Sequence, residues 1–439
     1  MFEPRIAVLF RTYQWDDFAR RSAERIALQA DGMDLFISVD ETNSGPVDTA
    51  PFRKLAHTTT TMEARGLRCL TPAGAAALWW NCDYAIYDGM LAAPGYDYYL
   101  NIEDDVAVNT PLRPFIGAMG DQNIDCVPTF GPNPVARWSF RSSLETLPYP
   151  DLSWCALSTV FLTARAAKYL YDERVKLGQE HVDGEPWAMC EGFVSSALRA
   201  GGFSVVELRA LSRLEHFGTE VVLLETDPRA SEPGTFAHSV LDLERFIAKF
   251  KSRYLRAMLS AGLRRDLAAS RTALLNGGRS ELDGWRILAA TGNLALDRPA
   301  RQSSVSPYSR RPMWAHLDPN AVDAEGGNCG VLTGDAGFHT DVEANPWWQV
   351  DLGAGSVVGR VRLYNRRVAA ERARRLSILV SDDERIWITA FHKADERVFA
   401  GPDDPLDCTL AMPATCRFVR VSLDGTDYLH LDEIEVFAA

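Results

Sequence analysis

The chain has 439 residues, more than one ordinary folding domain contains, so we expect two or three domains. Hydrophobic residues make up 46% and charged residues 24%, values that exclude a disordered, collagenous or fibrous chain. With 46 basic and 59 acidic side chains the net charge is −13, which argues against a large phosphate-binding surface. We therefore expect no nucleic-acid partner.

Residues 1–225 alternate strand-like and helix-like patterns. An apolar run at 5–13 is followed by apolar residues at helical spacing over 15–30 and by a second strand-like run at 34–42. The alternation continues at 77–91 (helix), 96–108 (strand), 153–177 (strand, then helix) and 190–208 (helix, then strand). These patterns predict an α/β domain with a largely parallel, helix-covered sheet, whose ligands bind beyond the carboxyl ends of the strands.

Residues 226–290 read as mostly helical and hold the one basic stretch of the chain. Between 241 and 271 there are eight Arg or Lys against three acids, a net charge of +5. A solvated helical linker is the simplest interpretation. The alternative is a surface that docks on anionic lipid at the inner face of a membrane, or on an acidic face of the same protein.

Residues 291–439 lose the helical pattern and predict an all-β sandwich or barrel whose first and last strands pair. Six short strand-like runs are separated by Gly, Asp, Asn and Pro, at 347–353, 359–366, 375–383, 385–392, 417–425 and 430–437.

The eight cysteines lack both the paired spacing of a zinc site and the clustering of a disulfide framework, so we expect reduced, mostly buried thiols. The N-terminus lacks the basic flank and the long apolar core of a signal peptide. No apolar run approaches the roughly 20 residues that cross a bilayer. Together these features predict a cytoplasmic protein.

Three consecutive acids, Glu103, Asp104 and Asp105, end the third predicted strand of the first region. Carboxylates so close together repel one another and lose solvation, so they need a compensating cation. Mg²⁺ or Mn²⁺, with its other positions filled by water and diphosphate oxygens, suits them. A solvated acidic turn that caps the next helix is the alternative, but a position beyond a strand end favours the metal.

The first region resembles the GT-A class of nucleotide-sugar-dependent glycosyltransferases. The resemblance rests on the runs 5–13 and 35–42 and on Asn-Ile-Glu-Asp-Asp at 101–105, which looks like the Asp-x-Asp metal motif of that class in a Glu-Asp-Asp form. It implies a GT-A, Rossmann-like fold over residues 1–225 and a nucleoside-diphosphate sugar as donor. It also implies nucleoside contacts from Arg11, Thr12, Tyr13 and Asp40, contacts to ribose or a ligand water from Glu103 and Asp104, and metal binding by Asp105 with Glu103.

The same resemblance places a catalytic base near the start of a helix, where Glu185 and Glu191 are candidates and Glu191 is preferred. The helix dipole favours an ionised carboxylate there, which then activates a sugar hydroxyl. Helix capping is the alternative role for either glutamate. His216 resembles the histidine that many of these enzymes add to the metal shell, and a structural histidine is its alternative. The implied chemistry is glycosyl transfer, with inversion of the anomeric configuration if a base is used.

Residues 292–439 resemble the discoidin family, also called the coagulation factor C-type (F5/8 type C) domain, through separated motifs in the same order. The resemblance implies an eight-stranded jelly-roll-like sandwich that binds carbohydrate in bacterial relatives. It is strongest to the F-type, fucose-binding lectins, which implies sugar contacts from His339, Arg366 and Arg372. This sequence departs from those lectins, since Val368 stands where they have an acid and the spacing to Arg372 is one residue shorter. Arg367, Arg374 and Arg375 are therefore alternative cations, and an anionic glycan is the alternative to fucose.

The discoidin resemblance also implies a structural Ca²⁺ site, for which Asp323 and Glu433 match, with solvated turn acids as the alternative. The leading hypothesis is a cytoplasmic, metal-dependent glycosyltransferase for surface polysaccharide synthesis whose sandwich module holds a glycan acceptor. Two alternatives stay open. One is a lectin-like protein with an inactive transferase domain, and the other is a sugar-nucleotide hydrolase or nucleotidyl transferase.

Overall fold

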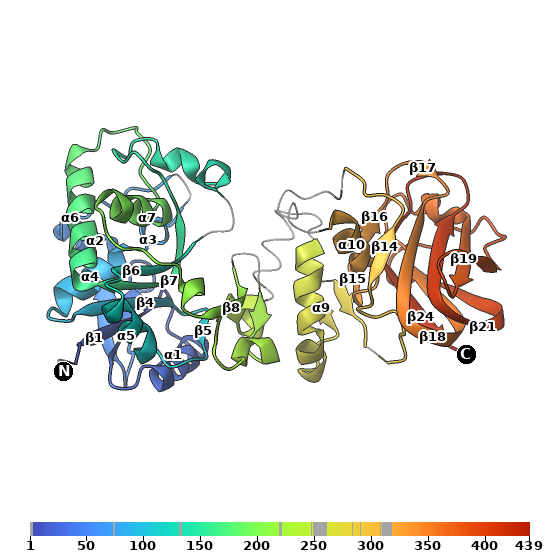
Figure 1. The fold of residues 1–439 in the computed structure, drawn as a ribbon, viewed down its shortest axis with the longest axis horizontal. Coiled ribbons are helices and arrows are strands. Elements are labelled where there is room, and N and C mark those ends of the chain that lie inside the picture. Colours follow the sequence, from blue (N-terminus) through green and yellow to red (C-terminus); the bar gives the residue numbers. More distant parts are fainter. Residues whose placement is uncertain are drawn as a thin grey trace. The chain divides into compact units, whose positions relative to one another are not determined.

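The computed structural model describes residues 3–439 except 73–74, 131–133, 219–221, 247, 249–260, 283, 290, 308 and 310–317. The chain divides into two compact units, Met1–Asp242 and Leu243–Ala439. The first unit is blue to green in Figure 1 and contains a mixed sheet with helices. The second is yellow to red and contains long antiparallel strands.

A six-stranded sheet in the order β3-β2-β1-β4-β7-β6 forms the centre of the first unit. Its strands are β1 (Ile6–Thr12), β2 (Asp34–Asp40), β3 (Arg53–His57), β4 (Tyr98–Glu103), β6 (Cys126–Phe130) and β7 (Cys155–Thr163). The pairs among β1, β2, β3 and β4 are parallel, whereas β7 runs antiparallel to both β4 and β6. The sheet is therefore mixed, and the predicted parallel arrangement holds for four strands only.

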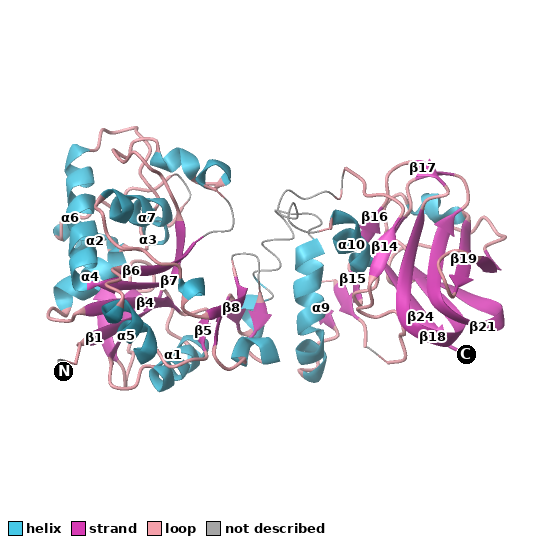
Figure 2. Cartoon of the chain, in the orientation of Figure 1, coloured by secondary structure: helices cyan, strands magenta, loops and turns pink. Residues whose placement is uncertain are grey.

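Helices cover both faces of this sheet, and Figure 2 shows them in cyan against the magenta strands. Successive side chains of β1 point to opposite faces of the sheet, and both faces are apolar. Val8 and Phe10 belong to the apolar cluster on one face, and Ala7 and Leu9 belong to the cluster on the other. The first cluster includes α1 (Asp17–Gln29) and α5 (Arg113–Asp121). The second includes α2 (Thr59–Ala64), α3 (Ala77–Trp80), α4 (Tyr84–Ala92), α6 (Ala164–Glu180) and α7 (Cys190–Ala200).

Five short strands complete the first unit: β5 (Val106–Val108), β8 (Arg213–Phe217), β9 (Leu223–Leu224), β10 (Thr235–His238) and β11 (Val240–Leu241). β10 pairs antiparallel with β5 and parallel with β8, and β11 pairs with β9. Residues 235–241, which we predicted as part of a linker starting at 226, thus belong to the first unit. Strands of two to four residues are too short to show a period of two, so the sequence did not reveal them.

The second unit is built around antiparallel strands in the order β14-β18-β21-β19-β20, with β24 also paired to β18. The six predicted strand-like runs fall on β18 (Trp347–Tyr364), β19 (Leu376–Ser381), β20 (Ile388–His392), β21 (Leu406–Leu423), β23 (His430–Leu431) and β24 (Glu433–Ala438). Asn293, outside the named strands, forms an isolated bridge with Phe437 of β24, so the two ends of the module meet there, whereas β14 and β24 each pair with β18. The remaining elements are β12 (Glu281–Leu282), β13 (Trp285–Ile287), β14 (Ala300–Gln302), α10 (Pro319–Ala324), β15 (Val331–Leu332), β16 (Phe338–His339), β17 (Glu343–Ala344), the 3-10 helix η7 (Ala370–Arg374) and β22 (Thr426–Asp427).

The predicted helical linker contains α9 (Ala261–Asn276), which belongs to the second unit. Arg271 of α9 donates to the carbonyl oxygen of Cys329 at 2.7 Å and pairs with Asp297 at 2.6 Å. This end of the basic stretch is therefore part of a fold rather than a solvated linker. The proposed lipid-docking surface at 241–271 falls largely on 249–260, outside the described residues. In the part of the chain that the structure describes, no helix combines the length and apolar character that crossing a bilayer requires.

Candidate functional site

A cavity of about 430 Å³ lies at the carboxyl ends of β1, β2 and β4. These ends meet because the three strands are parallel neighbours in the sheet. All the residues of the first unit that we expected to contact the nucleoside, or to form the acidic metal motif, line this cavity: Arg11, Thr12, Tyr13, Asp40, Glu103, Asp104 and Asp105.

The first two acids of the trio are held by the last two residues of β1, Arg11 and Thr12. Glu103 forms an ion pair with Arg11. The hydroxyl of Thr12 donates to Asp104 Oδ2 at 2.7 Å, and the backbone NH of Asp104 donates to the carbonyl oxygen of Arg11 at 3.1 Å. The acidic turn is therefore fixed against β1 and is not a freely solvated turn.

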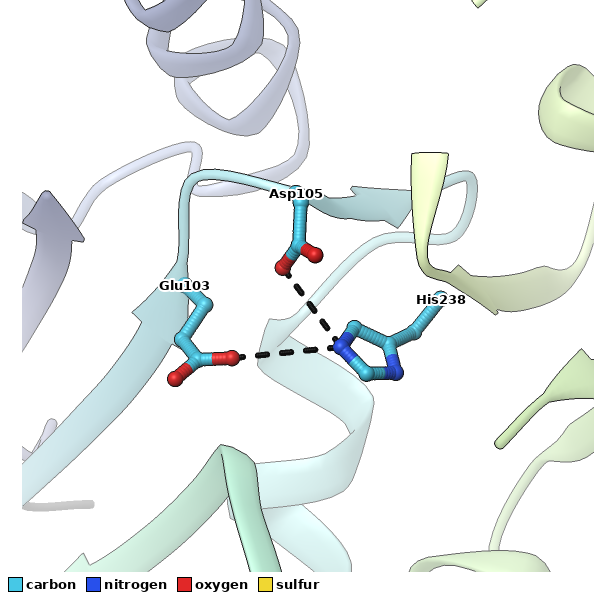
Figure 3. Close-up of side chains that lie close together, drawn as sticks. All are labelled: Glu103, Asp105 and His238. Atoms are coloured by element: carbon cyan, nitrogen blue, oxygen red, sulfur yellow. Dashed lines mark ion pairs between the residues drawn. The ribbon is translucent and has the colours of Figure 1, made fainter. Parts of the chain in front are cut away.

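The third acid faces a histidine from a distant part of the chain. His238 lies opposite Val106 in the pairing of β10 with β5, one residue from Asp105. Its Nε2 is 3.5 Å from Asp105 Oδ1 and 3.9 Å from Glu103 Oε2 (Figure 3). Ligand atoms of Glu103, Asp105 and His238 all lie within 4.8 Å of one another. Two carboxylates and an imidazole at this spacing fit one divalent cation such as Mn²⁺ or Mg²⁺.

The orientation of the His238 ring suits this role. Its Nδ1 lies 3.2 Å from the carbonyl oxygen of Gly218, which can only accept a hydrogen bond. Nδ1 therefore carries a proton, and Nε2 points toward the two carboxylates, where it can bind a cation in the neutral form of the ring. Ser239, the next residue, donates its hydroxyl to Asp105. The end of β10 thus orients both the imidazole of His238 and, through Ser239, the carboxylate of Asp105.

His216, which we predicted as the metal ligand, lies outside this cluster. It is on β8 beside Ala237 of β10, and its Nε2 is 3.8 Å from Glu232 Oε2. His238 occupies the place that we expected for His216. We missed it because the run 235–238 fell inside the predicted linker, and the buried Phe236 and Ala237 beside it are the only local signal of a strand.

Glu191 is the second residue of α7 and lies close to the cavity wall. Burial, followed by the charge of Cys82, raises the pKa of its carboxyl to about 8, while a hydrogen bond from the Leu157 NH and the charge of Arg11 act in the opposite sense. The expectation that the helix dipole keeps this carboxyl ionised is therefore wrong. A dipole contributes about 0.3–1 kcal/mol, less than the desolvation of a buried carboxylate.

Glu185, the other candidate base, is not close to the acidic trio. It is exposed and borders a separate cavity of about 240 Å³, together with His181 and Trp187. The structure therefore separates the two glutamates and leaves Glu191 as the one beside the cavity of the metal motif.

The first cavity also holds a histidine and aromatic side chains, and we had assigned no role to the histidine, His57. His57 ends β3 opposite Asp40, and burial lowers the pKa of its imidazole to about 4, so it is neutral at pH 7. Trp79 is 52% exposed although Phe140 packs edge-on against it at 6.0 Å, and Tyr13 is 64% exposed. The cavity therefore offers flat aromatic faces beside its polar floor.

The second unit brings its three predicted sugar-binding residues together. β16 and β23 pair so that His339 lies opposite His430, with ring centroids 5.0 Å apart. Tyr428 is 5.1 Å from His339, and the guanidinium of Arg372 lies 4.8 Å from the ring centre of Tyr428. Burial, together with the charges of Arg366 and Arg372, lowers the pKa of His339. We had assigned no role to His430 or Tyr428, although His430 begins the predicted strand-like run 430–437, because the strand pattern does not show which side chains lie beside His339.

The predicted Ca²⁺ ligands are buried and hydrogen-bonded to the protein. Asp323 Oδ2 accepts the backbone NH of His339 at 2.9 Å and the amide of Gln302 at 2.8 Å. Glu433 Oε1 accepts the backbone NH of Gly330 at 2.9 Å. Within the described residues, neither acid belongs to a group of three close metal-binding side chains. The Ca²⁺ site stays a prediction, and the observed role of both acids is to fix backbone.

Comparison with known proteins bears on the second unit. Residues 320–421 match the F5/F8 type C family model described as a NedA-like, galactose-binding domain. This part of the chain is a galactose-binding-like domain of the carbohydrate-binding type. The match confirms the discoidin resemblance there and leaves the first unit uncovered, so the GT-A resemblance stays a prediction. No curated protein matches the chain.

Three of the similar solved structures are binding modules that the match covers almost completely. The lectin domain of lectinolysin complexed with Lewis B antigen is 26% identical, and the match covers 34% of this chain and 99% of that one, with a TM-score of 0.26. A Streptococcus pneumoniae fucose binding module is 24% identical, with coverages of 34% and 95% and a TM-score of 0.26. A chitosan-binding module from Paenibacillus sp. IK-5 is 25% identical, with coverages of 33% and 98% and a TM-score of 0.23.

Proposed function

We propose that the first unit is a metal-dependent glycosyltransferase, which moves a sugar from a nucleoside-diphosphate donor to a glycan acceptor, and that the second unit binds a glycan. One observation carries the enzymatic proposal. A single cavity at the carboxyl ends of three parallel strands collects the acidic trio, and Glu103, Asp105 and His238 form a cluster of cation ligands at its edge.

When bound, a divalent cation supplies positive charge that offsets the negative charge developing on a diphosphate leaving group. Glu103, Asp105 and His238 hold it. Arg11 pairs with Glu103 and limits the repulsion among the acids. Asp104 is held by Thr12 with one carboxylate oxygen, so the turn keeps its shape whether or not a ligand is present.

Glu191 is the residue that we assign as base. With a pKa of about 8 its carboxyl is mostly protonated at pH 7 and becomes a proton acceptor as the pH approaches 8. A partly exposed base of this pKa is well matched to removing the proton of a hydroxyl whose acidity rises in the transition state. The exposed faces of Tyr13 and Trp79 support the binding of a sugar ring at the cavity.

The glycan-binding proposal for the second unit rests on the cluster of His339, Arg366 and Arg372 within a domain of galactose-binding type. Guanidinium groups present parallel donors that match vicinal hydroxyls or carboxylates. Arg372 Nε lies 3.5 Å from Asp427 Oδ1, whereas Arg366 forms no ion pair among the described residues. Tethering such a domain to a transferase raises the local concentration of an acceptor glycan.

The test of the enzymatic proposal uses the full chain, Mn²⁺ and a panel of nucleoside-diphosphate sugars, with release of nucleoside diphosphate as the readout. We expect release that depends on Mn²⁺ and on an acceptor, and that is lost in Asp105→Ala. Asp151→Ala, an exposed acid of the same unit that does not border the cavity, is the matched control and should behave as wild type.

Three outcomes separate the alternatives. Release that ignores the acceptor would identify a sugar-nucleotide hydrolase. Absence of Mn²⁺ and nucleotide binding in wild type would leave a lectin-like protein with an inactive first unit. A glycan array probed with wild type and with Arg366→Ala tests the second unit independently, since loss of signal in the variant is expected only if the cluster binds the glycan.

A further inference from the structure

Two thiols lie together in the wall of the first cavity. Cys82, just before α4, borders the cavity and is 7% exposed. Cys190, the first residue of α7, is fully buried behind it. Their Sγ atoms are 3.2 Å apart, and both cysteines are free. Segments far apart in the sequence thus bring together the sulfurs of a cysteine that borders the cavity and of a fully buried one, and this separation must close to about 2.05 Å in a disulfide.

The two thiols differ in acidity. A hydrogen bond from Cys190, and the charge of Arg11, lower the pKa of the Cys82 thiol to about 7, whereas burial raises the pKa of Cys190. Burial also raises the pKa of Cys69 to about 12, so this cysteine is far less nucleophilic at neutral pH. Cys82 therefore has the character of an attacking thiolate, and Cys190 has the position of a resolving thiol.

We propose that Cys82 and Cys190 form an oxidisable dithiol, a modification site that a small disulfide of the glutathione class converts into an internal disulfide. The Cys82 thiolate attacks one sulfur of the reagent and releases a reagent thiolate. Cys190 then gives up its proton and attacks the sulfur of Cys82, which releases the second reagent thiol. The protein loses two electrons and two protons, and the reagent disulfide is reduced to two thiols.

Arg11 connects this dithiol to the cation cluster. Its guanidinium lies beside Cys82, whose charge interacts with it, and it forms an ion pair with Glu103. A disulfide offers Arg11 no negative charge. After oxidation Arg11 no longer interacts with a negative charge on Cys82, so its interaction with Glu103 becomes stronger. Glu103 is then a poorer cation ligand. We expect Mn²⁺ to bind about fivefold more weakly to the oxidised protein, at the lower end of typical coupling between two sites.

This coupling rests on the proposed function, but the dithiol itself does not, so two readouts are needed. In the first, reduced full-length protein is treated with oxidised glutathione at neutral pH, the remaining thiols are alkylated, and the peptides are mapped by mass spectrometry. We expect a Cys82–Cys190 crosslink. A glutathione adduct that persists on wild-type Cys82, a crosslink between other cysteines, or no reaction would overturn the proposal.

Two variants make the mapping decisive. Cys190→Ser should stop at a stable glutathione adduct on Cys82, because the resolving thiol is missing. Cys126→Ser, which removes a buried cysteine of β6, is the matched control and should form the crosslink as wild type does. Circular dichroism shows whether each variant folds. If a variant does not fold, the presence or absence of the crosslink in wild type decides whether Cys82 and Cys190 form the proposed disulfide.

The second readout is Mn²⁺ titration of the reduced and oxidised wild type. Weaker binding after oxidation that dithiothreitol reverses supports the coupling. Equal affinities in the presence of a mapped crosslink would refute the coupling. If even the reduced protein binds no Mn²⁺, the proposed function fails and the coupling fails with it, while the crosslink still decides whether the dithiol exists.

Discussion

Glu191 should make the first unit less stable as the pH rises. Its carboxyl has a pKa of about 8 in the folded protein against an ordinary value of 4.5, because burial and the charge of Cys82 disfavour the ionised form. At pH values between these two pKa values, the Glu191 carboxyl is ionised in the unfolded chain and protonated in the folded chain. Each rise of one pH unit in this range lowers the free energy of unfolding by about 1.4 kcal/mol, so the full interval would lower it by about 5 kcal/mol. Partial exposure of the side chain reduces this to about 2–3 kcal/mol.

Glu191→Gln removes the titration. We expect the variant to gain about 2–3 kcal/mol over wild type between about pH 5 and pH 9, with most of the gain developing between pH 4.5 and pH 8. Urea unfolding at several pH values, followed by amide hydrogen exchange in peptides that cover α7, measures the first unit by itself. Glu185→Gln changes an exposed glutamate and should show no such trend. A stability difference between Glu191→Gln and wild type that stays constant with pH would refute the burial argument.

Three further predictions concern single side chains. His238→Ala should weaken Mn²⁺ binding at least tenfold while His216→Ala leaves it unchanged, as measured by titration calorimetry, because only His238 faces the carboxylates. Arg174→Met should destabilise the first unit by about 3–5 kcal/mol in urea unfolding, because it leaves the fully buried Asp83 without its partner at 2.8 Å. Arg372→Ala should lower glycan-array binding about tenfold or more without changing Mn²⁺ affinity, because its charged donors serve the second unit alone.

The parts of the fold that could be predicted are those with a strong local pattern. β1 is a continuous apolar run, and α1 repeats its buried residues at helical spacing, so both appear within a residue or two of their predicted bounds. β6 was missed because Pro128 sits inside a five-residue run and argues against a strand there. The antiparallel insertion of β7 between β4 and β6 depends on pairing across the sheet, which no local pattern reports.

The candidate site likewise contains residues that a local sequence pattern predicts and residues that only long-range packing brings together. The acidic trio and Asp40 were predictable because the carboxyl ends of neighbouring parallel strands meet at one edge of a sheet. His238 and Cys82 were not predictable, since the position of the segment that carries each of them is set by long-range packing. The pKa of Glu191 could not be predicted either, because the sequence shows its place at a helix start and not the depth of its burial.

The charges around the cavity make one last prediction about the order of binding. Among the described residues that line the cavity, four carboxylates, those of Asp40 and the acidic trio, face the guanidinium of Arg11, and the imidazole of His57 is neutral because burial lowers its pKa to about 4. Without a cation this cavity repels a diphosphate, whose charges would lie beside the acids in a partly desolvated space. Uridine or guanosine diphosphate should therefore bind at least tenfold more weakly in the presence of a chelator than with Mn²⁺, by calorimetry at constant ionic strength. Equal affinity in both conditions would show that the acids do not act through a cation, and Asp105→Asn should bring the affinity with Mn²⁺ down to the chelator value if they do.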